Sequence, residues 1–203
     1  MMTVYIETER LILRDWREAD VLPFQQMNAN QQVRRFFPSL LSSRRSELDL
    51  KKMDDVIKET GVGLFAVELK ETNGWLGFIG LNYVPKNSKY KFTELPFYEI
   101  GWRLIPEVWD NGIATEGAQA VLSYAKERGF EHIYALAAEQ NEASIRVMKK
   151  IGMEQFDFFE YPDLSNYHPL KRHVRYHIQL KDVTKENKAA EHIAHACTLL
   201  GAH

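Results

Sequence analysis

The sequence contains a single cysteine in 203 residues, Cys197, which lies close to the C-terminus. One cysteine can form neither an internal disulfide nor a cysteine-based metal cluster. This scarcity is typical of proteins in a reducing compartment rather than of small secreted domains. We therefore expect a cytoplasmic protein.

Long hydrophobic runs are also absent. No stretch of about 18 apolar residues, the length that spans a bilayer, occurs in the sequence. The first residues, MMTVYIETERLILRDW, alternate apolar and charged side chains where a signal peptide needs an uninterrupted apolar segment. The sequence therefore predicts neither export nor membrane insertion.

The sequence also lacks an excess of either positive or negative charge. The 26 basic and 28 acidic residues are interspersed and leave a formal net charge of −2. Proteins that bind nucleic acid or anionic membranes concentrate basic residues in a patch or stripe. We therefore predict no nucleic-acid partner and no membrane partner.

The composition that remains is that of a soluble globular domain, with 45% hydrophobic and 27% charged residues. We expect one domain over residues 1–180, followed by a tail over 181–203 that is helical or partly disordered. The i, i+3 spacing of His192 and His195 in this tail is weak evidence for a metal ligand pair, because a solvated or packed helix face explains it better. The other histidines show no ligand spacing, so we predict no metal site.

Hydrophobic periodicity predicts a mixed order of strands and helices. Asp20 is expected to cap the first helix, and Gly61 to end the second one. The Asn-Gly of the connection Glu71-Thr72-Asn73-Gly74 predicts a β-hairpin, and the polar segment 85–96 predicts a long loop. The predicted strands are 4–14, 64–69, 75–83, 97–105, 133–138, 153–161 and 172–180, and the predicted helices are the low twenties, 44–59, the segment from 113 to Gly129, and 141–150.

The most informative segment joins a strand, YEIGWRLIP, through EVWDNG to a helix, IATEGAQAVLSYAKERG. The first turn of a helix has free backbone N–H groups that, with the helix dipole, attract anions such as phosphate. Gly112 and Ala114 would let a phosphate approach these groups closely, although taken alone small residues here more often reflect tight packing. A nucleotide-binding P-loop is excluded because no Gly-Lys-Ser/Thr follows.

Four segments of the sequence resemble the GNAT superfamily, in particular its RimJ/RimL-type branch of amine and protein N-terminus acetyltransferases. They are ETERLILRDW, EIGWRLIPEVW, WDNGIATEG and NEASIRVMKKIGM, and they occur in the family's order. The resemblance implies an α/β (α+β) fold with a mixed, mostly antiparallel central sheet of about seven strands and helices on both faces. It also implies a transferase that takes acetyl-CoA as cosubstrate and needs no metal.

The resemblance assigns a set of acetyl-CoA contacts to this sequence. Backbone amides from Asn111 through Thr115 would bind the pyrophosphate, and the backbone of Leu104 and Ile105 would pair with the pantetheine arm. Asn141 would hydrogen-bond to the same arm, and it is also a good N-cap for the helix that it begins. The expected cosubstrate contacts are therefore Leu104, Ile105, Asn111, Gly112, Ile113, Ala114, Thr115 and Asn141.

Two residues of the loop depart from the family's usual pattern. Trp109 stands where many members have a basic or amide residue, and Asp110 stands where the RimJ/RimL-type branch usually has glycine. A carboxylate close to a pyrophosphate would repel it, whereas an aspartate at a helix start is favoured by the dipole by about 0.3–1 kcal/mol. We favour the second interpretation, in which Asp110 caps the helix and points away.

Glu99 is the first candidate for the general base that must deprotonate the acceptor amine, because it resembles the catalytic glutamate of some GNAT enzymes. The alternative is a solvated carboxylate paired with Arg103 on the same face of the strand. Met148 occupies the position where many members have a tyrosine that protonates the leaving thiolate. Ser144 is the candidate replacement, with a helix-surface serine as the alternative, and Glu160 is the candidate paired carboxylate.

The acceptor is not identified by the sequence. A protein N-terminus, a polyamine, an aminoglycoside or another small amine would all suit the predicted chemistry, and similarity to related enzymes suggests a homodimer by analogy only. The competing hypothesis is an acyl-CoA-binding sensor with impaired catalysis, since the usual tyrosine is missing and Asp110 replaces glycine.

Overall fold

A computed structural model describes residues 2–180 of the chain. The expectations for the tail, including those for His192, His195 and Cys197, therefore lie outside the described residues. None of the helices within 2–180 combines the length and apolar composition needed to cross a bilayer.

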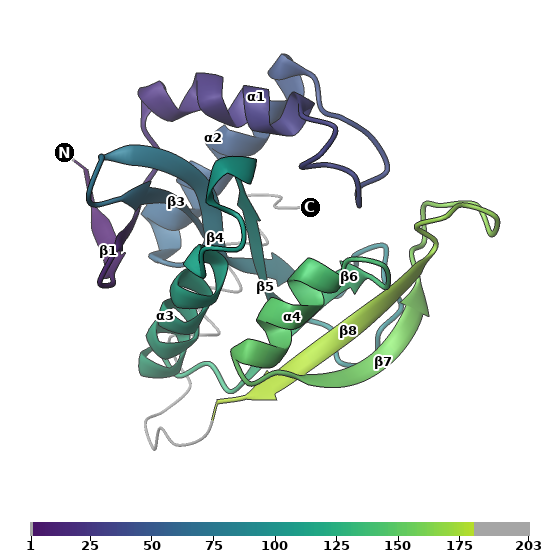
Figure 1. Ribbon diagram of the computed structural model, residues 1–203. Helices are drawn as coiled ribbons and strands as arrows, with labels where there is room; N and C mark the ends of the chain where they lie inside the picture. Colours follow the sequence, from purple (N-terminus) through teal and green to yellow (C-terminus); the bar gives the residue numbers. More distant parts are fainter. Residues whose placement is uncertain (1, 181–203) are drawn as a thin grey trace.

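The described chain folds around one eight-stranded sheet (Figure 1). Its strands lie in the order β1-β2-β3-β4-β5-β6-β8-β7, and every neighbouring pair is antiparallel except β5 and β6. The mixed, mostly antiparallel sheet that we predicted is thus confirmed. The strands are β1 (Val4–Glu7), β2 (Leu11–Arg14), β3 (Leu64–Leu69), β4 (Gly74–Val84), β5 (Phe97–Leu104), β6 (His132–Ala138), β7 (Glu154–Glu160) and β8 (Arg172–Gln179).

The strand count differs from the expected seven because the predicted strand 4–14 is in fact two strands. The chain reverses after β1, where the Thr8 amide donates to the carbonyl of Leu11 at 3.0 Å, and β2 then pairs antiparallel with β1. The apolar alternation continues through both strands, so the pattern alone does not reveal the turn. The prediction of one long strand was wrong.

Helices cover both faces of the sheet, as predicted (Figure 1). Phe24 of α1 contacts Phe78 of β4, whereas Gly117 of α3 packs against Ile79, the next residue of the same strand. Adjacent residues of a strand point to opposite faces, so α1 and α3 lie on opposite sides. The helices are η1 (Glu18–Asp20), α1 (Val21–Ala29), α2 (Ser43–Thr60), η2 (Pro106–Val108), α3 (Ile113–Glu127) and α4 (Glu142–Lys150).

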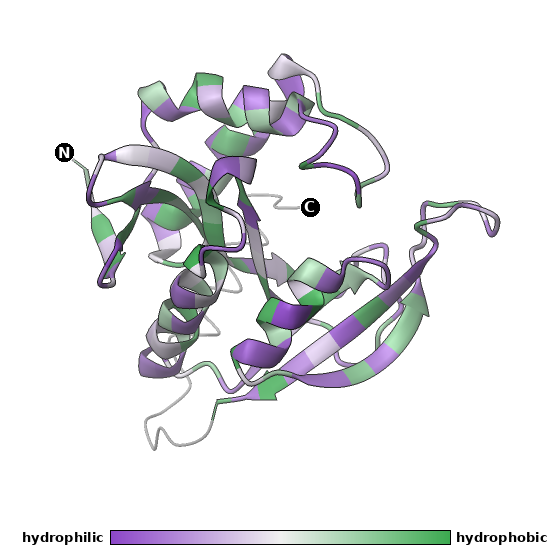
Figure 2. Ribbon diagram, viewed as in Figure 1, coloured by the Kyte–Doolittle hydropathy of each residue, from purple (hydrophilic) through white to green (hydrophobic). Residues whose placement is uncertain are grey.

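The core lies between the sheet and these helices. Hydrophilic and hydrophobic residues alternate along α3 and α4, which is the pattern of helices with one buried face (Figure 2). Gly61 adopts the left-handed conformation at the end of α2, which confirms the predicted helix end. Asp20 is the N-cap residue of α1, as predicted, but its side chain makes no cap bond, because its carboxylate binds Arg14 and the Arg17 amide instead.

The sheet separates in its middle, and this separation positions the site. The only parallel pair among residues 2–180, β5 and β6, is in register at Tyr98 with Ile133 and at Glu99 with Tyr134. Beyond Glu99 the two strands diverge, while β5 remains paired with β4 as far as Leu104. The edge of β5 that faces β6 is therefore open over its second half.

Candidate active site

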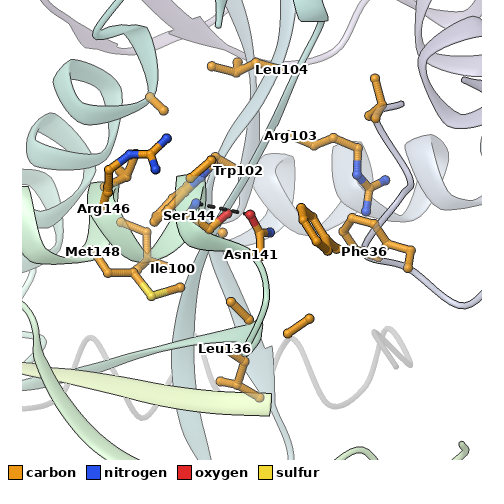
Figure 3. A pocket seen from close by; sticks show the side chains of 18 of the residues that line it. Phe36, Ile100, Trp102, Arg103, Leu104, Leu136, Asn141, Ser144, Arg146 and Met148 are labelled. Carbon is orange, nitrogen blue, oxygen red and sulfur yellow. Dashed lines mark hydrogen bonds between the residues drawn. The ribbon is translucent and has the colours of Figure 1, made fainter. Parts of the chain in front are cut away.

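A cavity of about 580 Å³ opens where β5 leaves β6. This volume is in the range of small-molecule and cofactor sites. Its walls include the second half of β5, the end of β6, the first turn of α3, most of α4 and the segment 32–38 (Figure 3). The predicted site residues that line it are Glu99, Leu104, Gly112, Ile113, Ala114, Thr115, Asn141 and Ser144.

The start of α3 supplies free backbone donors to this cavity. The first intrahelical bond of α3 is donated by the Glu116 amide to the Gly112 carbonyl at 3.0 Å. The amides of Ile113, Ala114 and Thr115 precede it, and they make no hydrogen bond within residues 2–180. Three N–H groups at a helix N-terminus that open onto a cavity form an anion site.

The loop before α3 makes a tight turn that uses two left-handed residues. Gly112 is the N-cap residue with φ of +76°, and Asp110 has φ of +59°. A left-handed φ favours glycine and tolerates aspartate, so Asp110 can adopt a conformation that would otherwise suit glycine at this position. Asp110 is exposed, lines the cavity and is not the cap, so our cap interpretation was wrong.

Arg10, which lies near the N-terminus just before β2, binds this loop. Its Nη1 donates to the carbonyl of Asn111 at 2.9 Å, and its Nε lies 2.6 Å from the Glu116 carboxylate in the first turn of α3. Burial favours the neutral Glu116 carboxyl, but the hydrogen bonds from Thr8 and Arg10 prevail and lower its pKa. Sequence reasoning placed Arg10 in a matching segment, ETERLILRDW, without finding this role.

The predicted pantetheine contacts are only partly available. The Ile105 amide donates to the carbonyl of Leu76 at 2.9 Å, and Ile105 does not line the cavity, so its expected role does not fit. Backbone groups of alternate residues in an antiparallel strand point to opposite sides, so those of Leu104 face the open edge. The Leu104 carbonyl already accepts a bond from Trp109 Nε1 at 2.9 Å.

The predicted contact between Asn111 and the pyrophosphate is likewise only partly supported. Its carbonyl binds Arg10, its side-chain amide donates to the Trp109 carbonyl at 3.1 Å, and it does not line the cavity. Asn111 therefore shapes the loop from outside. Of the predicted amides, those from Gly112 onward belong to residues that line the cavity.

Asn141 and Ser144 meet at the start of α4 (Figure 3). The Asn141 side-chain oxygen accepts from the Ser144 amide at 3.2 Å, which is the N-cap bond that we predicted. Oδ1 is used in this bond, and Nδ2 makes no hydrogen bond within the described chain. Both residues line the cavity, so Nδ2 of Asn141 and the hydroxyl of Ser144 can serve a ligand.

Glu99 lies at the point where β5 and β6 separate, and it lines the cavity. Its Oε1 accepts from Asn82 Nδ2 at 3.0 Å across the β4–β5 pair. Burial raises the pKa of this carboxyl, and the Asn82 bond and the charge of Lys89 oppose the rise only partly. No ion pair between Glu99 and Arg103 occurs in residues 2–180, so the alternative pairing is wrong.

Glu160 lies apart from this group. It is at the end of β7, its side chain is 73% exposed, and its oxygen lies 3.9 Å from Lys171 Nζ. It does not line the cavity, so the structure does not bring it together with Glu99. His173 on β8 does line the cavity, and burial lowers its pKa, although no motif in the sequence singled it out.

Comparison with known proteins decides the family. The family model of the acetyltransferase (GNAT) domain matches residues 10–154, from Arg10 through the whole of α4. The chain belongs to the GNAT acetyltransferase family. This membership confirms the predicted family and the predicted class of enzyme, an N-acetyltransferase.

Relatives and solved structures agree with this assignment. The chain is 31% identical to the uncharacterized N-acetyltransferase YnaD of Bacillus subtilis over 158 residues, which are 77% of this chain and 86% of YnaD. A GNAT family acetyltransferase from Bacillus anthracis is 26% identical with a TM-score of 0.70, covering 90% of this chain and 100% of that one. RimL, a ribosomal L7/L12 α-N-protein acetyltransferase in complex with coenzyme A, shares the fold, with a TM-score of 0.68 at 16% identity over 87% of this chain and 98% of its own.

Within residues 2–180, no three His, Cys, Asp or Glu side chains gather in a way that could hold a metal ion.

Proposed function

We propose that this chain transfers the acetyl group of acetyl-CoA directly to a primary amine while both substrates are bound. The observation that carries the proposal is the position of three free amides, at Ile113, Ala114 and Thr115, in the same cavity as the half-buried carboxylate Glu99. The amides suit a pyrophosphate, and the open edge of β5 suits an extended arm that runs from it toward Glu99.

Glu99 is the proposed general base. A primary amine is an ammonium ion at neutral pH and must lose a proton before its nitrogen can attack the thioester carbonyl. Burial raises the pKa of Glu99, which makes its carboxylate a stronger base than an exposed glutamate. Asn82 fixes one oxygen of the carboxylate, which leaves the other free to accept the proton.

Ser144 is the proposed donor to the leaving sulfur. Glu99 takes one proton from the ammonium ion and releases it to solvent, and the neutral nitrogen then attacks the thioester carbonyl to form the nitrogen–carbon bond. The tetrahedral intermediate collapses with cleavage of the carbon–sulfur bond, and its nitrogen gives up a second proton. The thiolate takes a proton through the Ser144 hydroxyl, and the acetylated amine leaves as an amide. The Asn141 bond to the Ser144 amide holds this serine at the cavity.

The test combines binding with turnover. We expect saturable binding of acetyl-CoA at one site in isothermal titration, and release of free thiol when an amine acceptor is added. Thr115→Glu places a carboxylate among the free amides and should abolish binding, whereas Gln119→Glu adds the same charge to an exposed position one turn further along α3 and should not.

The outcomes separate the hypotheses. No binding by the wild-type chain at millimolar acetyl-CoA contradicts the proposal. Binding that Thr115→Glu abolishes, without thiol release on any amine of a broad panel, would instead support the acyl-CoA sensor.

A further inference from the structure

Arg103 presents a cation to the cavity and forms no ion pair within residues 2–180. Its Nη1 donates to the side-chain oxygen of Asn28 at 2.7 Å, and its guanidinium lies 4.4 Å from the ring centre of Phe37 and 5.2 Å from that of Phe78. Nε is buried without a hydrogen-bond partner, and Nη2 has no acceptor within residues 2–180. The side chain lines the cavity close to Phe36 (Figure 3).

A second buried cation lies beside it. Arg34 is 8% exposed, and its guanidinium stands 4.7 Å from the centre of the same Phe37 ring. Burial and the charge of Arg34 lower the pKa of Arg103 to about 9, against the opposing charge of Asp49. Asp49 itself is held 2.8 Å from Arg45. The described chain therefore leaves this end of the cavity with excess positive charge.

Arg103 and Glu99 share one face of β5 and are separated by Gly101 on that face. A β-carbon added to Gly101 would meet no atom within 4 Å, so the floor between the two side chains is open. Glu99 and Arg103 are four positions apart along the strand, which places their Cα atoms about 13 Å apart. Their side chains shorten the distance that a ligand must bridge. A base and a cation thus stand at opposite ends of one open groove.

We propose that the acceptor amine carries a carboxylate, and that Arg103 binds this carboxylate while the amine lies toward Glu99. This inference rests on the proposed acetyl transfer. A carboxylate would supply the acceptor that Nη2 lacks and offset the positive charge, since arginine forms strong charge-assisted bonds with carboxylates. A polyamine would bring further positive charge to Arg103 and Arg34 and would be repelled.

The test compares amines that differ only in this group. Glycine, β-alanine, γ-aminobutyrate and ε-aminocaproate would be assayed by thiol release beside their carboxamides, with spermidine as a polycation. We expect kcat/KM to favour the acid of the best-fitting length over its carboxamide by about 10- to 100-fold, as for a hydrogen bond to a charged group. The chain length with the greatest preference measures the distance between the two subsites.

Variants of Arg103 assign the preference to this residue. Arg103→Gln should reduce the preference for the acid to nearly one, because it raises KM for the acid far more than KM for its carboxamide. Arg103→Lys should retain part of the preference because it keeps the charge. Arg128→Gln is the matched control, since Arg128 packs on Tyr124 after α3 and does not line the cavity. Acetyl-CoA binding in isothermal titration reports that each variant is folded.

Failure of the inference can be told apart from failure of the proposed reaction. A wild-type chain that acetylates carboxamides or spermidine as well as the acids, or an unchanged preference in Arg103→Gln, overturns the carboxylate subsite and leaves acetyl transfer standing. If no amine is acetylated, the reaction fails, and the subsite is judged by titrating the N-acetylated acids in the presence of CoA. Wild-type binding that is lost in Arg103→Gln supports the subsite. No binding by the wild type, or equal binding by the wild type and the variant, overturns it.

Discussion

Replacing Arg14 by methionine should leave a buried carboxylate without its cation. Arg14 is 2% exposed, and its Nη1 and Nη2 bind both oxygens of Asp20 at 2.7 and 3.0 Å. Its Nε binds Glu68 at 2.8 Å, and Glu68 also has a more exposed partner, Arg17. This group joins β2 and β3 to the turn before α1, the helix that carries the Asn28 partner of Arg103.

The expected loss follows from the burial of the partners. The side chains of Asp20 and Glu68 are 3% and 5% exposed, so neither can be rehydrated without local opening. Removing one partner of a buried pair costs about 3–5 kcal/mol. For a chain of this length each kcal/mol lowers Tm by about 2–4 °C, so we expect Tm to fall by about 6–20 °C. Urea unfolding followed by tryptophan fluorescence would measure the loss, because Trp16 is buried next to this group.

Two controls test the reasoning. The triple variant Arg14→Met, Asp20→Leu, Glu68→Leu removes all three charges and should recover most of the loss, because apolar groups need no buried cation. Lys51→Met breaks an exposed pair with Asp55 and should cost less than about 1 kcal/mol. A loss below about 1 kcal/mol for Arg14→Met, or a triple variant no more stable than the single one, would refute the argument.

Three further predictions concern the cavity. Glu99→Gln should lower kcat by about 10²–10⁴-fold. Because folding raises the pKa of Glu99 above its ordinary 4.5, the ionised carboxylate destabilises the folded state once the pH rises past that value. The variant should therefore be more stable than the wild type in urea unfolding at neutral pH, but not below pH 4.5. Asp110→Gly should bind acetyl-CoA about two- to fivefold more tightly in isothermal titration, since a nearby charge is removed and φ of +59° suits glycine, while Glu107→Gln, outside the cavity, should change nothing. Arg10→Gln should weaken acetyl-CoA binding about three- to tenfold by releasing Asn111 and Glu116, and an affinity equal to that of Lys51→Gln would contradict this role.

Local patterns predicted most of the fold. The Asn-Gly connection gave a correct hairpin between β3 and β4, and Gly61 marked the end of α2, because turns and helix ends depend on a few neighbouring residues. The reversal between β1 and β2 was missed because apolar alternation does not stop there. Asp20 was correctly placed at the start of α1, but its bond to Arg14 was missed, because Arg14 belongs to another element and local spacing cannot reveal such a contact.

The site was predictable where backbone geometry defines it. Free amides at the start of α3 and the cap bond of Asn141 follow from helix ends, and these predictions agree with the structure. The roles of Ile105 and Glu160 depended on which way the backbone or side chain points at a strand end, and a one-residue change of register reverses that direction. Arg103 was noted only as a partner of Glu99, because its actual neighbours, Asn28 and Phe37, come from distant segments.

The separation of β5 from β6 divides the sheet into two half-sheets that share a short joint. The joint consists of the pairs Tyr98 with Ile133 and Glu99 with Tyr134, and the rings of Phe97 and Tyr134 pack beside it with centres 4.5 Å apart. A rotation of one half-sheet against the other would change the width of the cavity most at the Leu104 end. Glu99 would move least, because it lies at the pivot, so the reacting end of the cavity would keep its geometry while the other end adjusts to the size of its ligand.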